Sequence, residues 1–224
     1  MKSMHLRSIV AAAVALLAAT ACSSATRTAR TYPNQMGDAA AVARARSDSA
    51  RYPYTEGDVE FMSGMIGHHA QAIVMSKWAA SHGASASVQT LAERIINAQQ
   101  DEILTMQHWL HDRGQPVPEA KAAPMKMKMN GMEHEMLMPG MLTEAQMQEL
   151  DSARGADFDR LFLTYMIQHH KGAVAMVKDL FAKNGAGQDE TVFKFASDVN
   201  VDQTTEIARM ERMLFMMKLE SKTP

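Results

Sequence analysis

Cysteine is almost absent from this chain, whose 224 residues include only Cys22. A lone thiol cannot build a disulfide framework or a thiolate metal cluster. Any soft-metal chemistry in the body of the protein must therefore use thioether and imidazole groups. Aromatic residues are also scarce, at 6%, whereas the 21 methionines are far more than the packing of a core requires.

An excess of basic charge is missing as well, because 23 Lys and Arg residues stand against 25 Asp and Glu residues. Nothing in this balance favours nucleic acid as a partner. The sequence also has no Ser or Cys nucleophile constellation, no glycine-rich phosphate loop and no HExxH helix. It therefore carries none of these sequence signatures of enzymatic activity.

The apolar run at the start of the chain, residues 9–19, is too short to span a bilayer. It follows two basic residues and precedes small residues and Cys22, as is typical of an export signal. The AATAC sequence is similar to a bacterial lipoprotein cleavage site, although Ala19 stands where leucine is usual. We expect residues 1–21 to be a signal peptide and Cys22 to be lipidated, with an ordinary signal cut nearby as the alternative. The protein would then be exported, and either periplasmic or anchored to the outer membrane.

The segment after the signal, residues 22–50, is rich in Ser, Thr, Ala and Arg and lacks a sustained apolar face. This composition is typical of a flexible tether. A short helix over 39–46 is optional within it. We expect the folded domain to occupy residues 51–220.

One stretch occurs twice in that domain, as FMSGMIGHHAQAIVM at 61–75 and as FLTYMIQHHKGAVAM at 162–176. On a helix that turns about 100° per residue, His68 and His69 lie on either side of one apolar face. The repeat gives His169 and His170 the same placement. The residues of the first copy expected on the outer face are Ser63, Ala70, Gln71 and Lys77. One such pair could simply mark the boundary of an amphipathic helix, but its recurrence argues for two inward-facing pairs.

Each copy is followed by a second helical pattern that carries polar residues in its apolar face. In 85–112 these residues are Gln99 and Glu102, and the same Gln-x-x-Glu returns in 192–214, ending at Glu206. A carboxylate inside a core needs a charged or hydrogen-bonding partner, since leaving it bare costs roughly several kcal/mol. An edge position that reaches water is the alternative for the first glutamate.

The duplicated patterns predict two helical hairpins, over 55–112 and 143–219, joined by a long connection over 113–142. Thr143 and Gln146 form a capping box for a short helix ahead of the second repeat. Two helical hairpins joined in this way predict an all-α four-helix bundle.

The connection is rich in methionine, and MKMKM alternates Met125, Met127 and Met129 with lysine. An extended backbone would place these three thioethers on one side, and the alternate spacing continues through His134. Thioethers favour Cu(I), and imidazole accommodates either oxidation state of copper. The alternative is a flexible linker that covers the bundle, or an adaptable protein-binding surface.

The repeated Phe, Met-Ile, His-His and Ala-x-x-Met, the two Gln-x-x-Glu-Ile-x-x-Met stretches and the linking MPGMLTEAQMQEL resemble the bacterial family called domain of unknown function 305. The resemblance extends from about Tyr54 to Leu219. It implies a ferritin-like four-helix fold, usually in exported proteins, and an association of some members with copper binding and tolerance. The family's histidine and methionine positions fall on His68, His69, His169, His170, Met65, Met75, Met166 and Met176. Met213, where the first half has Trp109, departs from strict repetition.

The first hypothesis is a binding protein that captures exported copper, with Cu(I) favoured and Cu(II) left open. Its candidate ligands are the eight family positions above together with Met125, Met127, Met129 and His134. Glu102 and Glu206 would either coordinate directly or hold the imidazoles from behind. The partners would be the metal ion, a membrane reached through a lipid anchor at Cys22, and either a second copy of the chain or a copper-handling envelope protein.

Two other hypotheses stay open. Ferritin-like bundles can support di-iron oxidoreductases, but the usual arrangement uses two Glu-x-x-His motifs, and this chain has neither. Oxidation of bound Cu(I) is nevertheless compatible with the residues present, so the question of enzyme activity is not decided. The third hypothesis is an envelope interaction module whose histidines are structural.

Overall fold

The computed structural model describes residues 39–51, 53–122, 124–129 and 132–220. The predicted signal peptide, residues 1–21, and the predicted lipidation site Cys22 lie outside the described residues. Within the described ranges, no helix combines the length and apolarity that crossing a bilayer requires.

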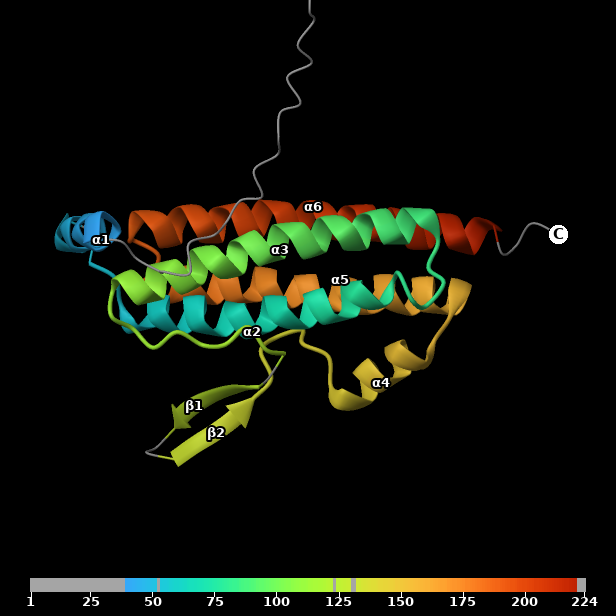
Figure 1. Cartoon of the computed structure of the whole chain (residues 1–224), viewed down its shortest axis with the longest axis horizontal. Coiled ribbons are helices and arrows are strands. Elements are labelled where there is room, and N and C mark those ends of the chain that lie inside the picture. The colour runs from blue at the N-terminus through green and yellow to red at the C-terminus, as the bar shows by residue number, and fades with distance from the viewer. Residues whose placement is uncertain (1–38, 52, 123, 130–131, 221–224) are drawn as a thin grey trace, which may run out of the picture. The chain divides into compact units, whose positions relative to one another are not determined.

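Four long helices form the body of the fold, accompanied by two shorter helices and a β-hairpin (Figure 1). In chain order the elements are α1 (Ala39–Arg51), α2 (Glu56–Trp78), α3 (Ala86–Asp112), β1 (Met125–Met129), β2 (Met132–Met136), α4 (Glu144–Ser152), α5 (Gly155–Ala182) and α6 (Glu190–Glu220). The predicted bundle of two helical hairpins is confirmed. The two strands are an addition to an otherwise all-α fold, and α1 shows that part of the predicted tether is helical.

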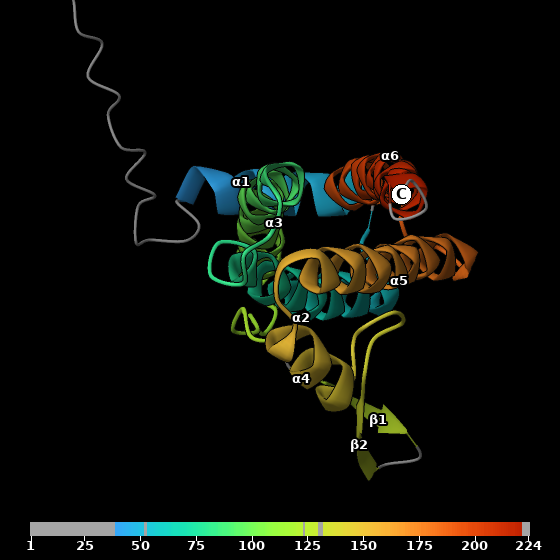
Figure 2. The same cartoon turned by 90° about the vertical axis from the view of Figure 1, so that its right-hand side faces the viewer.

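The helices α2 and α3 form hairpin one, and α5 and α6 form hairpin two. The two hairpins meet through α2 and α5, while α3 and α6 lie on the far side (Figures 1 and 2). In both views α4 and the β-hairpin lie on the other side of α2 and α5. The connection therefore returns over the two helices that carry the repeated histidines.

Capping residues fix where the helices begin. The Thr55 hydroxyl accepts from the backbone N–H of Asp58, and the Asp58 carboxylate accepts from the backbone N–H of Thr55 at 2.7 Å. This is a capping box at the start of α2. Thr143 and Gln146 form the predicted box at the start of α4, and Ser85 caps α3.

The first helix of each hairpin binds the turn of the other hairpin. Asp58 of α2 accepts a hydrogen bond from the backbone N–H of Gly187, which precedes α6, at 2.6 Å. Asp159 of α5 accepts one from the backbone N–H of Ser85, which precedes α3, at 3.1 Å. The two buried aspartates hold equivalent positions in the two copies of the repeat. The contacts therefore place α2 and α5 antiparallel, about an approximate twofold axis.

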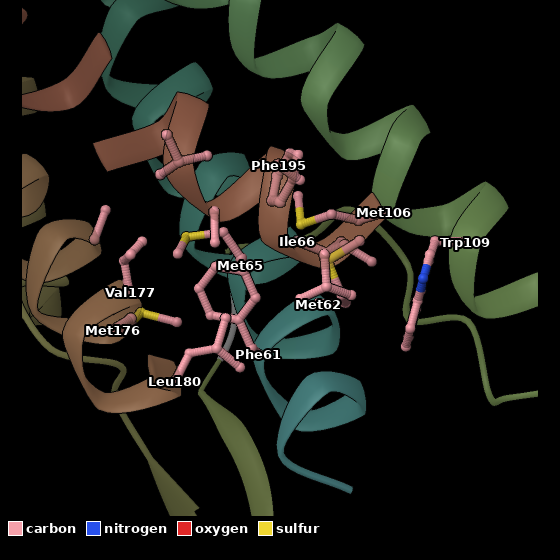
Figure 3. Close-up of a cluster of buried hydrophobic side chains, with 14 of the residues drawn as sticks. Phe61, Met62, Met65, Ile66, Met106, Trp109, Met176, Val177, Leu180 and Phe195 are labelled. Atoms are coloured by element: carbon pink, nitrogen blue, oxygen red, sulfur yellow. The ribbon is translucent and has the colours of Figure 1, made fainter. Parts of the chain in front are cut away.

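The core consists of two apolar clusters that succeed each other along the bundle. One includes Phe61, Met65, Met106, Met176 and Phe195 (Figure 3). The other includes Met75, Leu91, Phe162, Met166 and Met210. All four long helices contribute to each cluster. The break between the clusters falls where each helix carries its polar residues.

One prediction about α2 is wrong. Ala70 and Gln71, expected on the outer face, are buried because the end of the connection covers that face. The Gln71 amide donates to the carbonyl of Leu142 at 3.0 Å and accepts from its N–H at 2.7 Å. Lys77 is exposed, as expected.

Candidate metal centre

Polar side chains from all four long helices lie between the two apolar clusters, and we call them the polar layer. Its members are His68 and His69 of α2, Gln99 and Glu102 of α3, His169 and His170 of α5, and Gln203 and Glu206 of α6. The side chains of all four histidines are fully buried, whereas those of Glu102 and Glu206 are 20% and 17% exposed. The structure thus brings together the predicted histidines and glutamates of both halves.

Each hairpin forms the same histidine–glutamate pair. His69 Nε2 lies 2.7 Å from Glu102 Oε2. His170 Nε2–H donates to Glu206 Oε2, also at 2.7 Å. Nδ1 has no hydrogen-bond partner in either histidine, and the approach of His69 Nε2 to Glu102 Oε2 does not have the geometry of a hydrogen bond. A carboxylate behind one ring nitrogen, with the other nitrogen free, is the arrangement that orients metal-binding histidines in proteins.

His68 and His169, the first histidine of each His-His sequence, meet at the centre of the polar layer, and we call them the inner pair. Their ring centroids are 3.8 Å apart, whereas the centroids of sequence neighbours are 6.3 Å and 6.2 Å apart in α2 and α5. His68 Nε2–H donates to the carbonyl of Pro139 at 3.0 Å, and its Nδ1 has no partner. Neither ring nitrogen of His169 has a partner. The inner pair is therefore asymmetric.

Burial keeps the inner pair unprotonated. It lowers the pKa of His68 from 6.5 to about 3, and the adjacent His69 adds to this lowering. Burial also lowers the pKa of His169 well below its usual range, with His68 the next cause. A neutral imidazole offers a lone pair to a metal ion. Because His68 donates through Nε2, its lone pair is on Nδ1.

The polar layer contains more hydrogen-bonding atoms than the protein satisfies. Besides the histidine nitrogens, both amide atoms of Gln99 and Oε1 of Gln203 are buried without a partner. Each such atom costs about 1–3 kcal/mol, and folded proteins rarely gather several in one place. The concentration of these atoms indicates a layer that a bound ion or ordered water completes.

His82 shows how a structural histidine is arranged in the same protein. It is buried, yet its Nε2–H donates to the backbone carbonyl of Asp151 at 2.8 Å and its Nδ1 lies 2.9 Å from Ser81 Oγ. Both ring nitrogens are thus satisfied by the protein. The histidines of the polar layer differ from His82 in this respect, and not in their burial.

Carboxylates face the polar layer from the side of α3 and α6. Glu102 lines a cavity of about 620 Å³ in which the carboxylates outnumber the single ammonium group, with Asp101, Glu190, Asp198 and Asp202 against Lys194. Burial, followed by the charges of Glu102, Asp198 and Glu206, raises the pKa of Asp202. The negative potential of this side favours a cation in the layer.

The four methionines predicted to assist the histidines lie outside the polar layer. Met65 and Met176 belong to one apolar cluster (Figure 3), and Met75 and Met166 belong to the other. Each cluster therefore receives one of these methionines from α2 and one from α5. Within the part of the chain that the structure describes, no group of three or more His, Cys, Asp or Glu side chains is arranged to hold a metal ion.

The methionine-rich connection forms an antiparallel hairpin of β1 and β2. The Cα partners include Met125 with Met136, Met127 with His134, and Met129 with Met132. The expected extended backbone is present, and its pairing with a second strand was not predicted. The predicted ligands Met125, Met127, Met129 and His134 belong to this hairpin and not to the polar layer, and the side chains of 125–135 lie outside the described part.

A segment that sequence reasoning missed, Met138–Leu142, crosses α2 and α5 beside the inner histidines, and we call it the strap. Its Pro139 carbonyl receives the hydrogen bond from His68. The Gly140 carbonyl accepts from Gln168 Nε2 at 3.3 Å. Together with the bonds between Gln71 and Leu142, these contacts hold the strap to both hairpins.

A glycine of α5 makes room for the strap. A Cβ atom on Gly172 would lie 1.9 Å from the oxygen of Pro139. The sequence contains a signal for this arrangement, because glycine and glutamine exchange places around the histidines, in GHHAQ at 67–71 and QHHKG at 168–172. Both glutamines bind the strap, and the second glycine admits its backbone.

Several solved structures and a curated sequence are similar to this chain. A DUF305 protein of Streptomyces coelicolor, described as secreted, has 28% identity and a TM-score of 0.61, over 72% of this chain and 94% of that chain. CopM in its Cu(I)-bound form has 27% identity and a TM-score of 0.52, over 70% of this chain and 94% of that chain. CopM structures in Cu(II)-bound and Ag-bound forms are also similar.

Among curated sequences, the uncharacterized protein L153 of Acanthamoeba polyphaga mimivirus is 41% identical over 56 residues. These residues are 25% of this chain and 37% of that protein, so the chain spans little more than a third of this relative.

The family match covers most of the described fold. Residues 58–214 match the family, a range that contains the whole polar layer, the β-hairpin and the strap. The resemblance seen in the repeated histidine and Gln-x-x-Glu motifs is thereby confirmed. The chain belongs to the family described as Domain of unknown function (DUF305).

Proposed function

We propose that this protein is an exported copper-binding protein that sequesters copper in the bacterial envelope. The observation that carries the proposal is the set of buried imidazole nitrogens without partners in the polar layer. Neutral imidazole binds both oxidation states of copper. A bound ion would supply the partner that the protein itself supplies to His82 but not to these histidines.

Nδ1 is the atom through which we expect most of these histidines to bind. Nε2 is already engaged in His68 by a carbonyl and in His170 by a carboxylate, and in His69 it lies beside Glu102. Glu102 and Glu206 would then orient the imidazoles and balance the charge of the ion, and they would not be ligands themselves.

Cu(I) suits this layer better than a divalent ion. The described residues present no ready group of three His, Cys, Asp or Glu ligands, and Cu(I) tolerates low coordination numbers. The thioethers of the adjacent clusters are soft ligands that favour Cu(I). The similarity to CopM, whose structures include Cu(I)-bound, Cu(II)-bound and Ag-bound forms, supports copper as the metal and does not itself select the oxidation state.

The test is a copper titration under reducing and oxidising conditions, with far-UV circular dichroism to verify folding. We expect the pair variants H68L/H169L and H69L/H170L each to lose copper affinity by at least about tenfold. The matched control is His82→Gln, a change to a buried histidine outside the polar layer, which should bind copper like the parent. Folded pair variants with parental affinity would show that the histidines are structural.

Two further readouts separate the competing hypotheses. Multiple-turnover oxygen consumption with Cu(I) or Fe(II) would favour an oxidoreductase, whereas stable stoichiometric binding favours sequestration. Nitrogen-15 NMR of the imidazoles reports which ring nitrogen binds, and a shift confined to Nε2 would contradict the assignment to Nδ1.

Export and lipidation of Cys22 complete the proposal. The similar Streptomyces coelicolor protein is described as secreted, which supports export. Expression of the full chain in a bacterial host should give a membrane-associated protein, and Cys22→Ser should release it. Equal membrane association of both forms would exclude a lipid anchor at this residue.

A further inference from the structure

A group of thioethers outside the polar layer lines a cavity at the base of the β-hairpin. The cavity has a volume of about 330 Å³ and lies between the first turns of α2, the last turns of α5 and the segment 136–139. Three of its lining side chains are methionines, Met136 of β2, Met138 of the strap and Met176 of α5. Two parts of the chain, the segment 136–139 and α5, thus contribute methionines to one cavity.

These methionines extend from the surface to the core. Met136 is 45% exposed, Met138 is half-buried, and Met176 is 8% exposed. Met176 lies with Phe61 and Leu180, which also line the cavity (Figure 3). An ion could therefore enter at Met136 and reach a thioether held in the apolar cluster.

The charges around the cavity favour a cation. Glu60, Asp179 and Lys183 all line it, and Lys183 Nζ donates to Glu60 Oε2 at 2.5 Å. Two carboxylates against one ammonium group leave a negative balance at the opening.

The strap connects this cavity with the polar layer. Pro139 lines the cavity, and its carbonyl is the acceptor of the His68 Nε2–H. Pro139 thus contacts both the thioether cavity and His68 of the inner pair.

We propose that this cavity binds a soft monovalent cation, Cu(I) or Ag(I), through the thioethers of Met136, Met138 and Met176. Thioether ligands select such ions over the harder divalent metals. The proposal deepens the proposed function, on which it rests for the identity of the ion, because it adds a site at the strap from which the histidines can be supplied.

The experiment uses Ag(I) as the probe, which has the softness of Cu(I) without its redox chemistry. The background is the full chain with Cys22→Ser, because a thiol would bind silver itself, and with leucine at Met125, Met127, Met129 and Met132 to silence the hairpin. In this background M136L/M138L/M176L should bind one silver equivalent fewer and lose sulfur scattering in X-ray absorption. Leucine keeps the volume of methionine at a cost of less than about 1.5 kcal/mol per site.

A second cavity offers a matched control. It is also lined by three methionines, Met213, Met216 and Met217, but its charges balance, because Arg209 and Arg212 stand against Asp159 and Glu220. The variant M213L/M216L/M217L removes as many sulfur atoms and should keep the silver stoichiometry of the background. Equal losses in both triple variants would overturn the assignment of the site to the first cavity.

Unchanged silver stoichiometry and sulfur scattering in M136L/M138L/M176L would overturn the proposal. If that variant does not fold, Met136→Leu and Met138→Leu replace it, and each should weaken silver binding at least about tenfold, with parental affinity in both as the contradicting result. The pair variants of the polar layer keep the two proposals distinguishable. If they bind copper like the parent while silver binding still depends on the cavity methionines, the proposed histidine site fails and the cavity stands.

Discussion

The two helical hairpins carry the same residues in the polar layer but differ in how these residues are bonded, above all at the centre of the layer. In both, Nε2 of the second histidine lies 2.7 Å from a glutamate of the following helix. The first histidines differ, because His68 bonds to the carbonyl of Pro139 and His169 has no partner. Each outer pair is formed within one hairpin, whereas the inner pair meets the connection, which occurs once in the chain. A repeated sequence thus reproduces only the contacts that each copy makes by itself.

The ends of the hairpins differ for a similar reason. Trp109 Nε1–H donates to Asp189 Oδ1 at 3.0 Å, and Arg113 donates to the other oxygen of Asp189 at 2.7 Å. Asp189 also accepts from backbone N–H groups at the start of α6. Met213, the equivalent of Trp109, packs against an apolar cluster and has no donor. The departure from repetition marks the place where hairpin one anchors the start of α6.

Lowering the pH should give the largest change in the free energy of unfolding, because it acts on both histidines of the inner pair, one from each hairpin. The pKa of His68 is about 3 in the folded protein against 6.5 in the unfolded chain. Between these values the unfolded chain binds a proton that the folded protein does not. The free energy of unfolding is therefore highest above pH 6.5 and falls as the pH falls toward 3, by at most roughly 1.4 kcal/mol per pH unit for each such histidine.

His169 acts in the same direction as His68, since its pKa is also lowered. Urea unfolding across this pH range measures the slope. In H68L/H169L the slope should shrink, and an unchanged slope would assign the acid sensitivity to other groups.

Gly172→Ala should disrupt the packing of the strap on α5, and with it the contact by which the two hairpins differ. Its Cβ would lie 1.9 Å from the oxygen of Pro139, so the strap must move away from α5. We expect a net loss of about 2 kcal/mol in the free energy of unfolding, after the gain from the better helix former. The rate of hydrogen exchange at the amide of Leu142 should rise as the strap loosens. Lys171→Ala, at the exposed neighbouring residue, serves as the control and should change stability by less than about 1 kcal/mol.

Leucine at the two inner histidines should have opposite effects on the metal-free protein. His169→Leu removes two buried nitrogens without partners and should raise the free energy of unfolding by about 1 kcal/mol. His68→Leu deprives the Pro139 carbonyl of its donor and should lower it by about as much. Thermal or urea unfolding of the two variants measures the sign. Equal shifts would mean that the strap does not distinguish the two histidines.

The smallest difference should appear between the two glutamates. Glu102→Gln and Glu206→Gln remove equivalent charges behind equivalent histidines, so each should weaken copper binding by about 10-fold to 100-fold and by the same factor. A competition titration with a Cu(I) chelator measures both. Unequal losses would show that the hairpins are not equivalent toward the ion.

The repeat made most of the fold accessible from the sequence. Helical periodicity placed the histidines inward, and the offset polar pairs placed Glu102 and Glu206 in the same layer. The capping signal at Thr143 and Gln146 located the start of α4. These features are local, because each depends on residues within a few turns of one helix.

The strap was beyond such reasoning because its contacts join residues 28 to 71 positions apart, such as Gln168 with Gly140 and Gln71 with Leu142. Helical periodicity assigns Gln71 to the outer face of α2. That face is buried only because the strap packs against it.

The crossed aspartate contacts, of Asp58 with Gly187 and of Asp159 with Ser85, have a consequence for assembly. In each turn one backbone N–H is bound by the other hairpin, so an isolated hairpin would leave an aspartate and a turn N–H unmatched. Two identical hairpins could supply each other's missing groups through an isologous interface. The bundle is thus organised as a homodimer whose subunits have been fused into one polypeptide.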